Sequence, residues 1–310
     1  MLLTRCIPLA MLASLLQSPA CLSAADDRTK PAVRTFGRGA VIDGTVYLFG
    51  GGASIDIFTP NDGKWKQIAT DEPSSNTLYG DAIDGKLYLL DVHTRRLVSF
   101  DPKTERFVAL RSIPLQRINS TVIAAGGKLY VIGGYTEKVT EKNSVAVYDP
   151  KEDNWSDGPP LPGFEPLDHF HCAAMLDGKL HVVGGLLKDN KDQPHHRLDG
   201  DRWTRLADAP LHAMWKHAAV VAAEGQLYLL NPTATLPNNR NNPDKDAANF
   251  YRYDPKADKW HAIGRAPKDM PFVHFIPAAI GHRICFFGGF TARGPARPTR
   301  IFDVKTDRWE

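Results

Sequence analysis

Histidine residues are the groups of this sequence best suited to acid–base chemistry. His169 and His171 stand two residues apart beside Asp168, and His217 and His274 follow later in the chain. Imidazole and carboxyl groups exchange protons near neutral pH, so these five residues are candidates for proton transfer. Imidazoles also bind metals, but no Cys, Asp or Glu stands at a diagnostic metal-site spacing. We therefore predict neither a metal nor another cofactor.

A second group of residues has the composition expected of a ligand site. Arginine donates paired hydrogen bonds to carboxylates, and amide and aromatic side chains orient polar ligands. The sequence contains no Ser-His-Asp order, Walker loop or dinucleotide-binding fingerprint, so no common catalytic class is indicated. The candidate ligand-binding residues are Arg34, Arg38, Asn76, Arg117, Asn119, Trp215 and Lys216.

A repeated phrase supplies the elements that must position these residues. It is a small turn followed by an apolar strand that usually ends in paired glycines. Paired glycines suit a positive φ angle or a close approach of backbones. The six copies are DGTVYLFGG from Asp43, DGKLYLL from Asp84, GGKLYVIGG from Gly126, DGKLHVVGG from Asp177, EGQLYLL from Glu224 and GHRICFFGG from Gly281.

A second phrase follows each copy of the first and contains an aromatic residue, usually Asp-Pro, and then Trp or Phe. In the fourth copy Leu198 replaces the first aromatic residue and Trp203 follows after five residues. We interpret these aromatic residues as packing between neighbouring units. The other five pairs, all seven residues apart, are Phe58 with Trp65, Phe100 with Phe107, Tyr148 with Trp155, Tyr253 with Trp260 and Phe302 with Trp309.

Each repeat is predicted to form four strands, because short β-branched and aromatic runs alternate with Asp-Gly, Asp-Pro-Lys or Pro-rich turns. In the first repeat the expected strands are residues 36–42, 46–50, 54–59 and 64–68, with Asp-Gly joining the first two as a tight hairpin. A four-stranded sheet has two faces to cover. Radial stacking of such sheets covers both faces and leaves only short edges.

The two phrases resemble the kelch repeat family, and the resemblance covers the chain after about residue 34. It implies an all-β fold, a six-bladed kelch β-propeller with four antiparallel strands per blade. The predicted blades are 34–72, 73–114, 115–163, 164–210, 211–268 and 269–310. The last strand barely begins before Glu310, so we predict that part of residues 26–33 pairs with the final blade and closes the ring.

Loop lengths predict which face of the propeller carries the function. The turns on one face are short and uniform, whereas the opposite face has long loops at residues 135–143, 186–196, 231–249 and 290–299. Binding residues concentrate on variable loops held by a rigid scaffold. The innermost strands begin on this same face, and most of the candidate residues lie eight to ten positions before the turn that follows each of these strands. They are expected to surround one funnel.

The first 25 residues resemble a secretory signal peptide, with Arg5 ahead of an apolar stretch and small residues up to Ala25. We expect residues 26–310 to form one exported domain, periplasmic or secreted. Lipid anchoring at Cys21 is the alternative. After cleavage, Cys172 and Cys285 remain as two thiols in apolar strands, and no later segment is long and apolar enough to span a bilayer.

Composition narrows the partners of the chain. Its 310 residues carry a formal net charge of +3, and the basic residues form no run, so nucleic-acid binding is not indicated. The leading hypothesis is a monomeric binding module for a small polar or acidic ligand, either a glycan, a sugar acid or a peptide. The alternative is a sugar mutarotase that resembles the bacterial N-acetylneuraminate epimerases, in which the histidine candidates and Asp168 would transfer protons. A galactose oxidase-like site is disfavoured, because neither Cys172 nor Cys285 lies in a cross-linking context.

Overall fold

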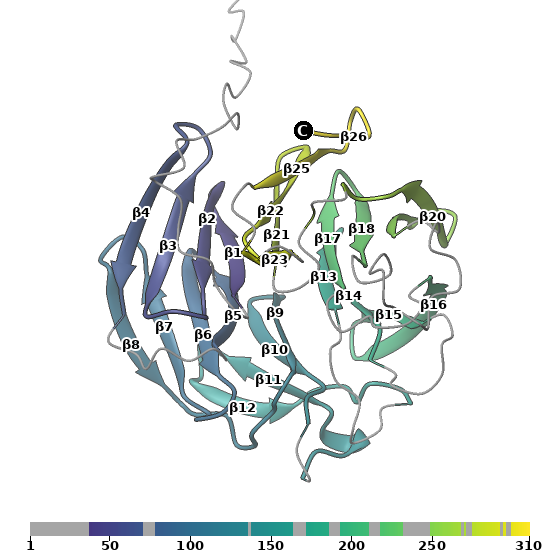
Figure 1. The fold of residues 1–310 in the computed structure, drawn as a ribbon. Coiled ribbons are helices and arrows are strands. Elements are labelled where there is room, and N and C mark those ends of the chain that lie inside the picture. Colours follow the sequence, from purple (N-terminus) through teal and green to yellow (C-terminus); the bar gives the residue numbers. More distant parts are fainter. Residues whose placement is uncertain are drawn as a thin grey trace, which may run out of the picture.

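The computed structural model describes residues 37–70, 78–135, 138–163, 172–185, 193–210, 218–231, 249–267, 270, 275–291, 294–295 and 299–310. Within these residues the regular elements are strands, apart from one 3-10 turn, Glu141–Asn143. Six four-stranded antiparallel sheets surround a common centre, as Figure 1 shows. Each sheet comes from one continuous stretch of chain, and we number the sheets as blades 1 to 6. The predicted all-β architecture with four strands per blade is confirmed.

The strands of the first three blades are β1 (Arg38–Ile42), β2 (Thr45–Phe49), β3 (Ser54–Thr59) and β4 (Lys64–Ala69); β5 (Leu78–Ile83), β6 (Lys86–Asp91), β7 (Leu97–Asp101) and β8 (Arg106–Leu110); and β9 (Thr121–Ala125), β10 (Lys128–Ile132), β11 (Val145–Asp149) and β12 (Asn154–Asp157). In every blade the first strand lies toward the centre and the fourth toward the outside (Figure 1).

The strands of the last three blades are β13 (Cys172–Leu176), β14 (Lys179–Val183), β15 (Gln193–Asp199) and β16 (Arg202–Ala209); β17 (Ala219–Ala223), β18 (Gln226–Leu230), β19 (Phe250–Asp254) and β20 (Lys259–Gly264); and β21 (Ile276–Ile280), β22 (Arg283–Phe287), β25 (Arg300–Asp303) and β26 (Arg308–Trp309). A two-stranded ribbon, β23 (Phe290–Thr291) with β24 (Gly294–Pro295), lies between β22 and β25.

Tight turns join the first two strands of the blades, as the Asp-Gly pattern predicts. In blade 1 the last pair of the hairpin is Ile42 with Thr45, which leaves Asp43 and Gly44 as the turn. Their φ angles are 49° and 76°, the left-handed values that a type I′ turn requires at both positions. The glycine pair at the end of a second strand also has the predicted positive φ, for example 91° at Gly134.

The aromatic pairs predicted from the second phrase are direct cross-strand partners. They lie opposite each other on the third and fourth strands of a blade, where side chains of paired residues are close enough to pack. The shortened fourth copy keeps the same cross-strand pairing, with Leu198 in the place of the first aromatic residue. The pairs are Phe58 with Trp65, Phe100 with Phe107, Tyr148 with Trp155, Leu198 with Trp203, Tyr253 with Trp260 and Phe302 with Trp309.

The hydrophobic core lies between the blades rather than within one central layer. Six apolar clusters occupy the six interfaces between neighbouring blades, each of which we term a seam. The seam between blades 6 and 1 closes the ring, with Leu48 packed in one cluster with Ile276 and Phe287. It is tight: a Cβ atom on Gly39 would lie 2.7 Å from Cγ2 of Ile276. The predicted packing between neighbouring units is confirmed.

The sixth blade has a short fourth strand, β26, in which Trp309 pairs with Phe302 of β25. Residues 26–33, predicted to close the ring, lie outside the described residues, as does the predicted signal peptide. In the part of the chain that the structure describes, no helix is long and apolar enough to cross a membrane.

Candidate functional site

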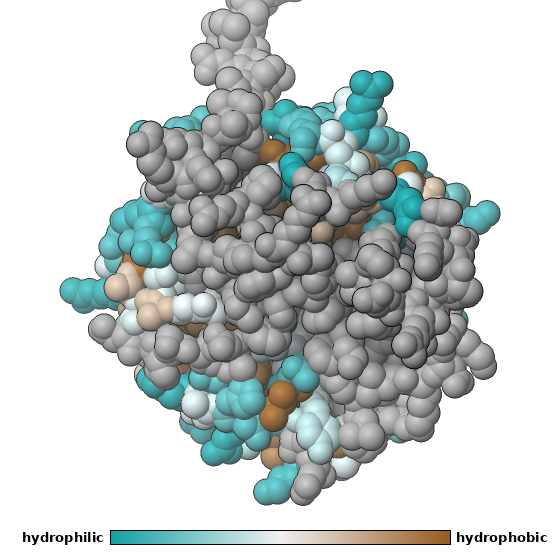
Figure 2. Space-filling view, in the orientation of Figure 1, coloured by the Kyte–Doolittle hydropathy of each residue, from teal (hydrophilic) through white to brown (hydrophobic). Residues whose placement is uncertain are grey.

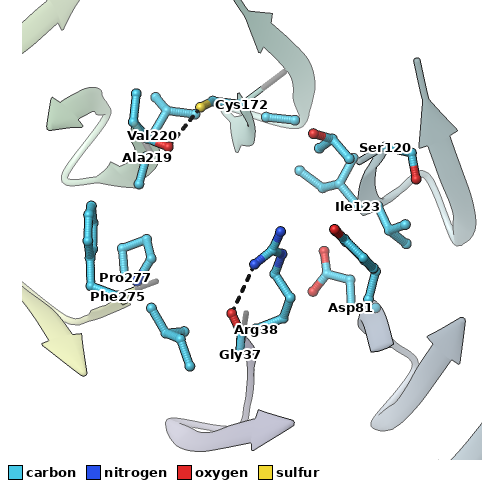
Figure 3. Close-up of a pocket in the computed structure, with 18 of the residues that line it drawn as sticks. Gly37, Arg38, Asp81, Ser120, Ile123, Cys172, Ala219, Val220, Phe275 and Pro277 are labelled. Atoms are coloured by element: carbon cyan, nitrogen blue, oxygen red, sulfur yellow. Dashed lines mark hydrogen bonds between the residues drawn. The ribbon is translucent and has the colours of Figure 1, made fainter. Parts of the chain in front are cut away.

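The innermost strands surround a cavity at the centre of the ring. Contacts join β1 to β5, β5 to β9, β9 to β13, β13 to β17, β17 to β21, and β21 back to β1. The starts of these six strands enclose a cavity of about 270 Å³ (Figure 3). In the face seen in Figure 2, the described residues toward the outer edge of the molecule are mostly hydrophilic, with a few hydrophobic ones among them. Residues from all six blades line this cavity.

Arg38 at the start of β1 contributes a cation to this cavity wall, and its side chain extends into the cavity (Figure 3). Its Cζ atom lies 4.4 Å from the centroid of the Tyr79 ring, which belongs to blade 2. Its Nη1 group donates a hydrogen bond of 3.0 Å to the carbonyl oxygen of Gly37. A guanidinium held over an aromatic face keeps a defined orientation, so Arg38 is placed to receive an anionic group of a ligand.

Asp81 in β5 brings a carboxyl group to the same cavity (Figure 3). Its Oδ1 atom accepts a hydrogen bond from the Ala82 amide, and its Oδ2 atom accepts one from the Ala124 amide in blade 3, both at 2.8 Å. Burial raises the pKa of this carboxyl group, and the two amides only partly oppose that shift. A carboxyl with a raised pKa can exchange a proton with a ligand closer to neutral pH than an exposed aspartate can.

Sequence reasoning did not select Asp81, although the repeats contain a signal for it. When the six units are aligned on the turn after the inner strand, the other five blades have small or apolar residues at this position. A carboxyl in an otherwise apolar layer is costly unless it is bonded or used. The five equivalents of Asp81 are Ala40, Ile123, Ala174, Val221 and Ala278.

The rest of the cavity wall combines small apolar groups with a few polar ones. Asn119 and Ser120 line it on the blade 3 side, and Ala173 and Ala219 line it from blades 4 and 5. The Cys172 thiol donates a hydrogen bond of 3.2 Å to the carbonyl oxygen of Ala218. Burial raises the pKa of this thiol to about 12, so it is a protonated wall group at neutral pH.

Two of the predicted ligand-binding residues line the central cavity, and most of the other candidates lie outside the described residues. Arg38 and Asn119 line the cavity together, as expected for a shared site. Nine of the candidate positions lie outside the described residues, so their predicted roles stay predictions. They are Arg34, Asn76, Asp168, His169, His171, Trp215, Lys216, His217 and His274.

Arg117 is the exception, because it does not line the central cavity. Only 2% of the residue is exposed, and its guanidinium donates hydrogen bonds to the carbonyl oxygens of Gly133 (3.1 Å), Ser144 (3.2 Å) and Asn143. Burial lowers its pKa to about 10. The segment before β9 is bridged to the chain after β10 at Ile118, which puts Arg117 beneath that loop. Arg117 therefore lies apart from Arg38 and Asn119, fixes a loop, and lines a separate cavity beside Trp155. Its predicted ligand-binding role stays a prediction.

A metal centre finds no support in the described part of the chain, where no group of three His, Cys, Asp or Glu side chains lies close enough to hold an ion. The described cavity wall contributes the Arg38 guanidinium, the Asp81 carboxyl and neighbouring hydroxyl and amide groups.

Comparisons with known proteins agree with this architecture. The family model for the Kelch motif matches residues 116–162, the stretch that contains blade 3. Kelch-like protein 25 of Xenopus tropicalis is 26% identical over 73% of this chain and 37% of its own length. The N-acetylneuraminate epimerase of Pasteurella multocida is 22% identical over 83% of this chain and 86% of its own length. The solved structure of YjhT superposes with a TM-score of 0.70 at 16% identity, covering 91% of this chain and 98% of that one.

The ring of six four-stranded blades around a central cavity defines a six-bladed β-propeller. Each blade carries the two sequence phrases described above, and the third matches the family model directly. The chain is a kelch-repeat β-propeller. It spans between 16% and 42% of the length of the kelch-like relatives such as Kelch-like protein 25, so the other parts of those proteins have no counterpart in the match.

Proposed function

We propose that this propeller binds a small polar ligand with a carboxylate group, such as a sugar acid, the acidic end of a glycan or of a peptide, in its central cavity. The observation that carries the proposal is the Arg38 guanidinium, which extends into the cavity and is stacked on Tyr79. Kelch propellers commonly act as interaction modules, which supports a binding role.

The size and wall of the cavity favour a small ligand. A volume of about 270 Å³ is near the lower end of the range for small-molecule sites, which suits one sugar-sized group. Arg38 would meet the carboxylate with two parallel N–H groups. Ala173 and Ala219 would contact the carbon skeleton, and Asn119 and Ser120 would hydrogen-bond to hydroxyl or amide groups.

Ligand-detected NMR tests the binding proposal. Saturation transfer to N-acetylneuraminate and to gluconate, with the neutral sugar N-acetylmannosamine as the comparison, measures binding to the wild-type chain. We expect Arg38→Gln to weaken binding of the two acids by more than about tenfold, because one charge-assisted bidentate contact is lost. Arg106→Gln is the matched control, since Arg106 is an exposed arginine of β8. Equal binding by Arg38→Gln and wild type would overturn the proposal.

A second candidate function, anomer exchange of a sugar acid, is favoured by Asp81. Ring opening and closure need a group that donates a proton and one that accepts it. Asp81 is a cavity carboxyl with a raised pKa, and the N-acetylneuraminate epimerase relative matches this chain over most of both lengths. His169, His171, His217, His274 and Asp168 stay predictions for the second proton-transfer group.

Exchange spectroscopy on N-acetylneuraminate separates the two functions. If the chain is a mutarotase, Asp81→Asn keeps ligand binding and loses exchange. If the chain is instead a binding module without catalysis, the wild-type chain gives no exchange above the uncatalysed rate. In that case Asp81→Asn binds the acids about tenfold more tightly, because a negative charge has been removed from the cavity. Wild-type exchange that survives Asp81→Asn unchanged would remove Asp81 from the mechanism.

We also propose that the first 25 residues direct export, so that the ligand is met outside the cytoplasm. Sequencing the N-terminus of the mature protein tests this. A mature chain that begins at Asp26 supports the proposal, a chain that begins at a lipidated Cys21 supports anchoring, and an uncleaved Met1 overturns both.

A further inference from the structure

The seam between blades 4 and 5 contains a buried pair of imidazoles. His181 of β14 is 2% exposed and His195 of β15 is fully buried, and Nδ1 of His181 lies 2.9 Å from Nε2 of His195. The His195 ring packs edge-to-face on Tyr253 of blade 5 with ring centroids 4.7 Å apart, and lies 5.5 Å from Trp260. Two titratable rings are thus bonded to each other inside an aromatic interface.

The repeat itself shows that the fold does not need imidazoles here. At the position of His181, four other blades have tyrosine. One of these, Tyr88, contacts Tyr148 of the next blade, with 6.2 Å between the ring centroids. His181 contacts Tyr253 of the next blade at the same centroid distance, 6.2 Å. At the position of His195, four other blades have a buried apolar residue. The equivalents are Tyr47, Tyr88, Tyr130 and Tyr228 for His181, and Ile55, Leu97, Val145 and Phe250 for His195.

The charged groups around the pair would not stabilise a protonated, positively charged imidazole ring. Around His181 these are Arg197, Asp199 and Asp177, and Arg197 and Asp199 are engaged with each other through a two-point ion pair. Burial, followed by Arg197, lowers the pKa of His181 to about 4. The pair is therefore neutral at pH 7, with one ring donating to the bare nitrogen of the other.

His195 has equally little to offset a positive charge. Its neighbours are His181, Asp258, His196, the Tyr253 phenol and the backbone of Ala207. The Ala207 carbonyl already accepts a hydrogen bond from the Trp260 indole and only weakly opposes the lowered pKa. Asp258 already accepts hydrogen bonds from the Tyr253 hydroxyl and from a backbone amide of blade 4. Burial, followed by His181, lowers the pKa of His195 to about 3.

This seam leads directly to the central cavity. The Cys172 thiol of blade 4 donates its hydrogen bond to the Ala218 carbonyl, just before β17 of blade 5. Cys172 and Ala173 from blade 4 and Ala219 from blade 5 all line the cavity. Any loosening of the seam would therefore shift one side of the proposed ligand site.

We propose that the His181–His195 pair makes the seam between blades 4 and 5 acid-sensitive, and that its protonation opens the cavity wall at Cys172. The effect on ligand rests on the proposed function, whereas the opening of the seam does not. The direct contact between the rings requires a bare nitrogen. Two imidazolium rings have a proton on every nitrogen, so they cannot keep a 2.9 Å contact and must separate.

The direction of the effect follows from linkage. Histidine in the unfolded chain becomes cationic below about pH 6.5, whereas this pair stays neutral in the folded chain until much lower pH. The stabilisation is therefore complete above about pH 6.5 and is lost as the pH falls toward 4. At about pH 5 the unfolding equilibrium constant rises about 30-fold for one such histidine and about 1000-fold for two.

Urea unfolding at about pH 7.5 and about pH 5 tests this pH dependence. The substituted residues are those that other blades have at the equivalent positions. In the double variant His181→Tyr/His195→Val, the increase in the unfolding constant between the two pH values is expected to be about 100- to 1000-fold smaller than in wild type. His93→Gln is the control, because His93 is exposed and its loss should leave the wild-type increase unchanged. An increase in the double variant as large as in wild type would overturn the proposal.

Thiol labelling localises the opening and does not require a ligand. Labelling with 4,4′-dithiodipyridine followed by peptide mapping compares Cys172 with Cys285, which is fully buried in blade 6. We expect the labelling rate of Cys172 relative to Cys285 to rise at least tenfold at about pH 5 in wild type, and not in the double variant. No rise in wild type, or an equal rise in both, would refute the acid-sensitive seam. A seam that opens in a chain that binds none of the acids would refute only the proposed function.

Discussion

The same pattern of hydrogen bonds, which we call the clamp, occurs in the seam between blades 2 and 3 and in the seam between blades 4 and 5. In the first, the Trp155 indole donates to the Arg111 carbonyl at 2.8 Å, and Asp153 accepts from the Tyr148 hydroxyl at 2.7 Å and from the Arg111 amide at 2.9 Å. In the second, Trp260, Asp258, Tyr253 and Ala207 take the same places, with distances of 3.2, 2.8 and 2.9 Å. Each clamp ties the outer turn of one blade to the last strand of the blade before it.

The two seams differ in what fills the space beside the clamp. The first has Tyr88 and Leu97 there, and the second has His181 and His195. Since the backbone register and the clamp are the same, the difference is one of chemistry and not of geometry. The backbone register and the clamp are therefore the same in these two seams, whereas the side chains that pack beside the clamp differ.

The largest expected effect comes from removing the clamp tryptophan. Trp155→Ala deletes a side chain that is 8% exposed and leaves the Arg111 carbonyl without its donor, so we expect a loss of about 3 to 5 kcal/mol of unfolding free energy. Trp260→Ala should cost less, about 2 to 4 kcal/mol, because Trp260 is only partly buried. Urea unfolding measures both, and a cost below about 1 kcal/mol for Trp155→Ala would show that the clamp does not hold the seam.

The second effect concerns Arg117, which lies on the blade 3 side of the first seam. Arg117→Ala removes the donor to three carbonyl groups and is expected to cost about 2 to 4 kcal/mol while leaving the binding of acidic ligands unchanged in the folded protein. Arg38→Gln should show the reverse pattern, with weak binding and a small change in stability. Parallel unfolding and NMR titrations compare the two arginines. Lost binding in a stably folded Arg117→Ala protein would return Arg117 to the ligand site.

The third effect concerns the seam that closes the ring. Gly39→Val would place its Cβ within about 3 Å of Ile276, and we expect a cost of about 1 to 3 kcal/mol from overpacking. Adding Ile276→Ala relieves the collision, so the double variant should be more stable than the two single costs predict. A double-mutant cycle by urea unfolding measures this coupling, and strict additivity would mean that the two residues do not meet.

The smallest effect comes from the clamp aspartates. Asp153→Asn weakens the hydrogen bonds from the Tyr148 hydroxyl and the Arg111 amide, which lower the pKa of Asp153, and should cost about 1 kcal/mol for this exposed group. The pKa is depressed in the folded state, so the contribution is present above about pH 4 and fades as the pH falls further. Asp258→Asn should behave alike at pH 7. A difference between wild type and Asp153→Asn that persists at about pH 2 would contradict this origin.

Much of the frame could be predicted from the sequence, because it repeats. The Asp43-Gly44 turn and the pairing of Tyr148 with Trp155 follow from local rules that act within a few residues. Six copies of the same signal also made the number of blades countable. Such features depend on backbone register, which a short phrase specifies well.

The site was predicted less completely, for physical reasons that particular residues illustrate. Arg38 was selected and does line the cavity, whereas Arg117, which lies four residues farther from the turn of its repeat, folds beneath a loop. The difference depends on the bridge at Ile118, a contact between segments that the repeat pattern does not specify. Asp81 was missed because an acidic residue in a strand looks like ordinary alternation until the repeats are aligned with one another.

The order of the strands has a consequence for how the chain folds. Each blade is a continuous stretch whose strands pair with their neighbours in sequence, so every ladder of a blade can form without a long chain search. The contact of β1 with β21 is different, because it joins residues near 40 to residues near 276. This is the one inner-strand contact that spans nearly the whole described chain. We therefore expect it to form last during refolding, so Gly39→Val should accelerate unfolding while hardly changing the folding rate.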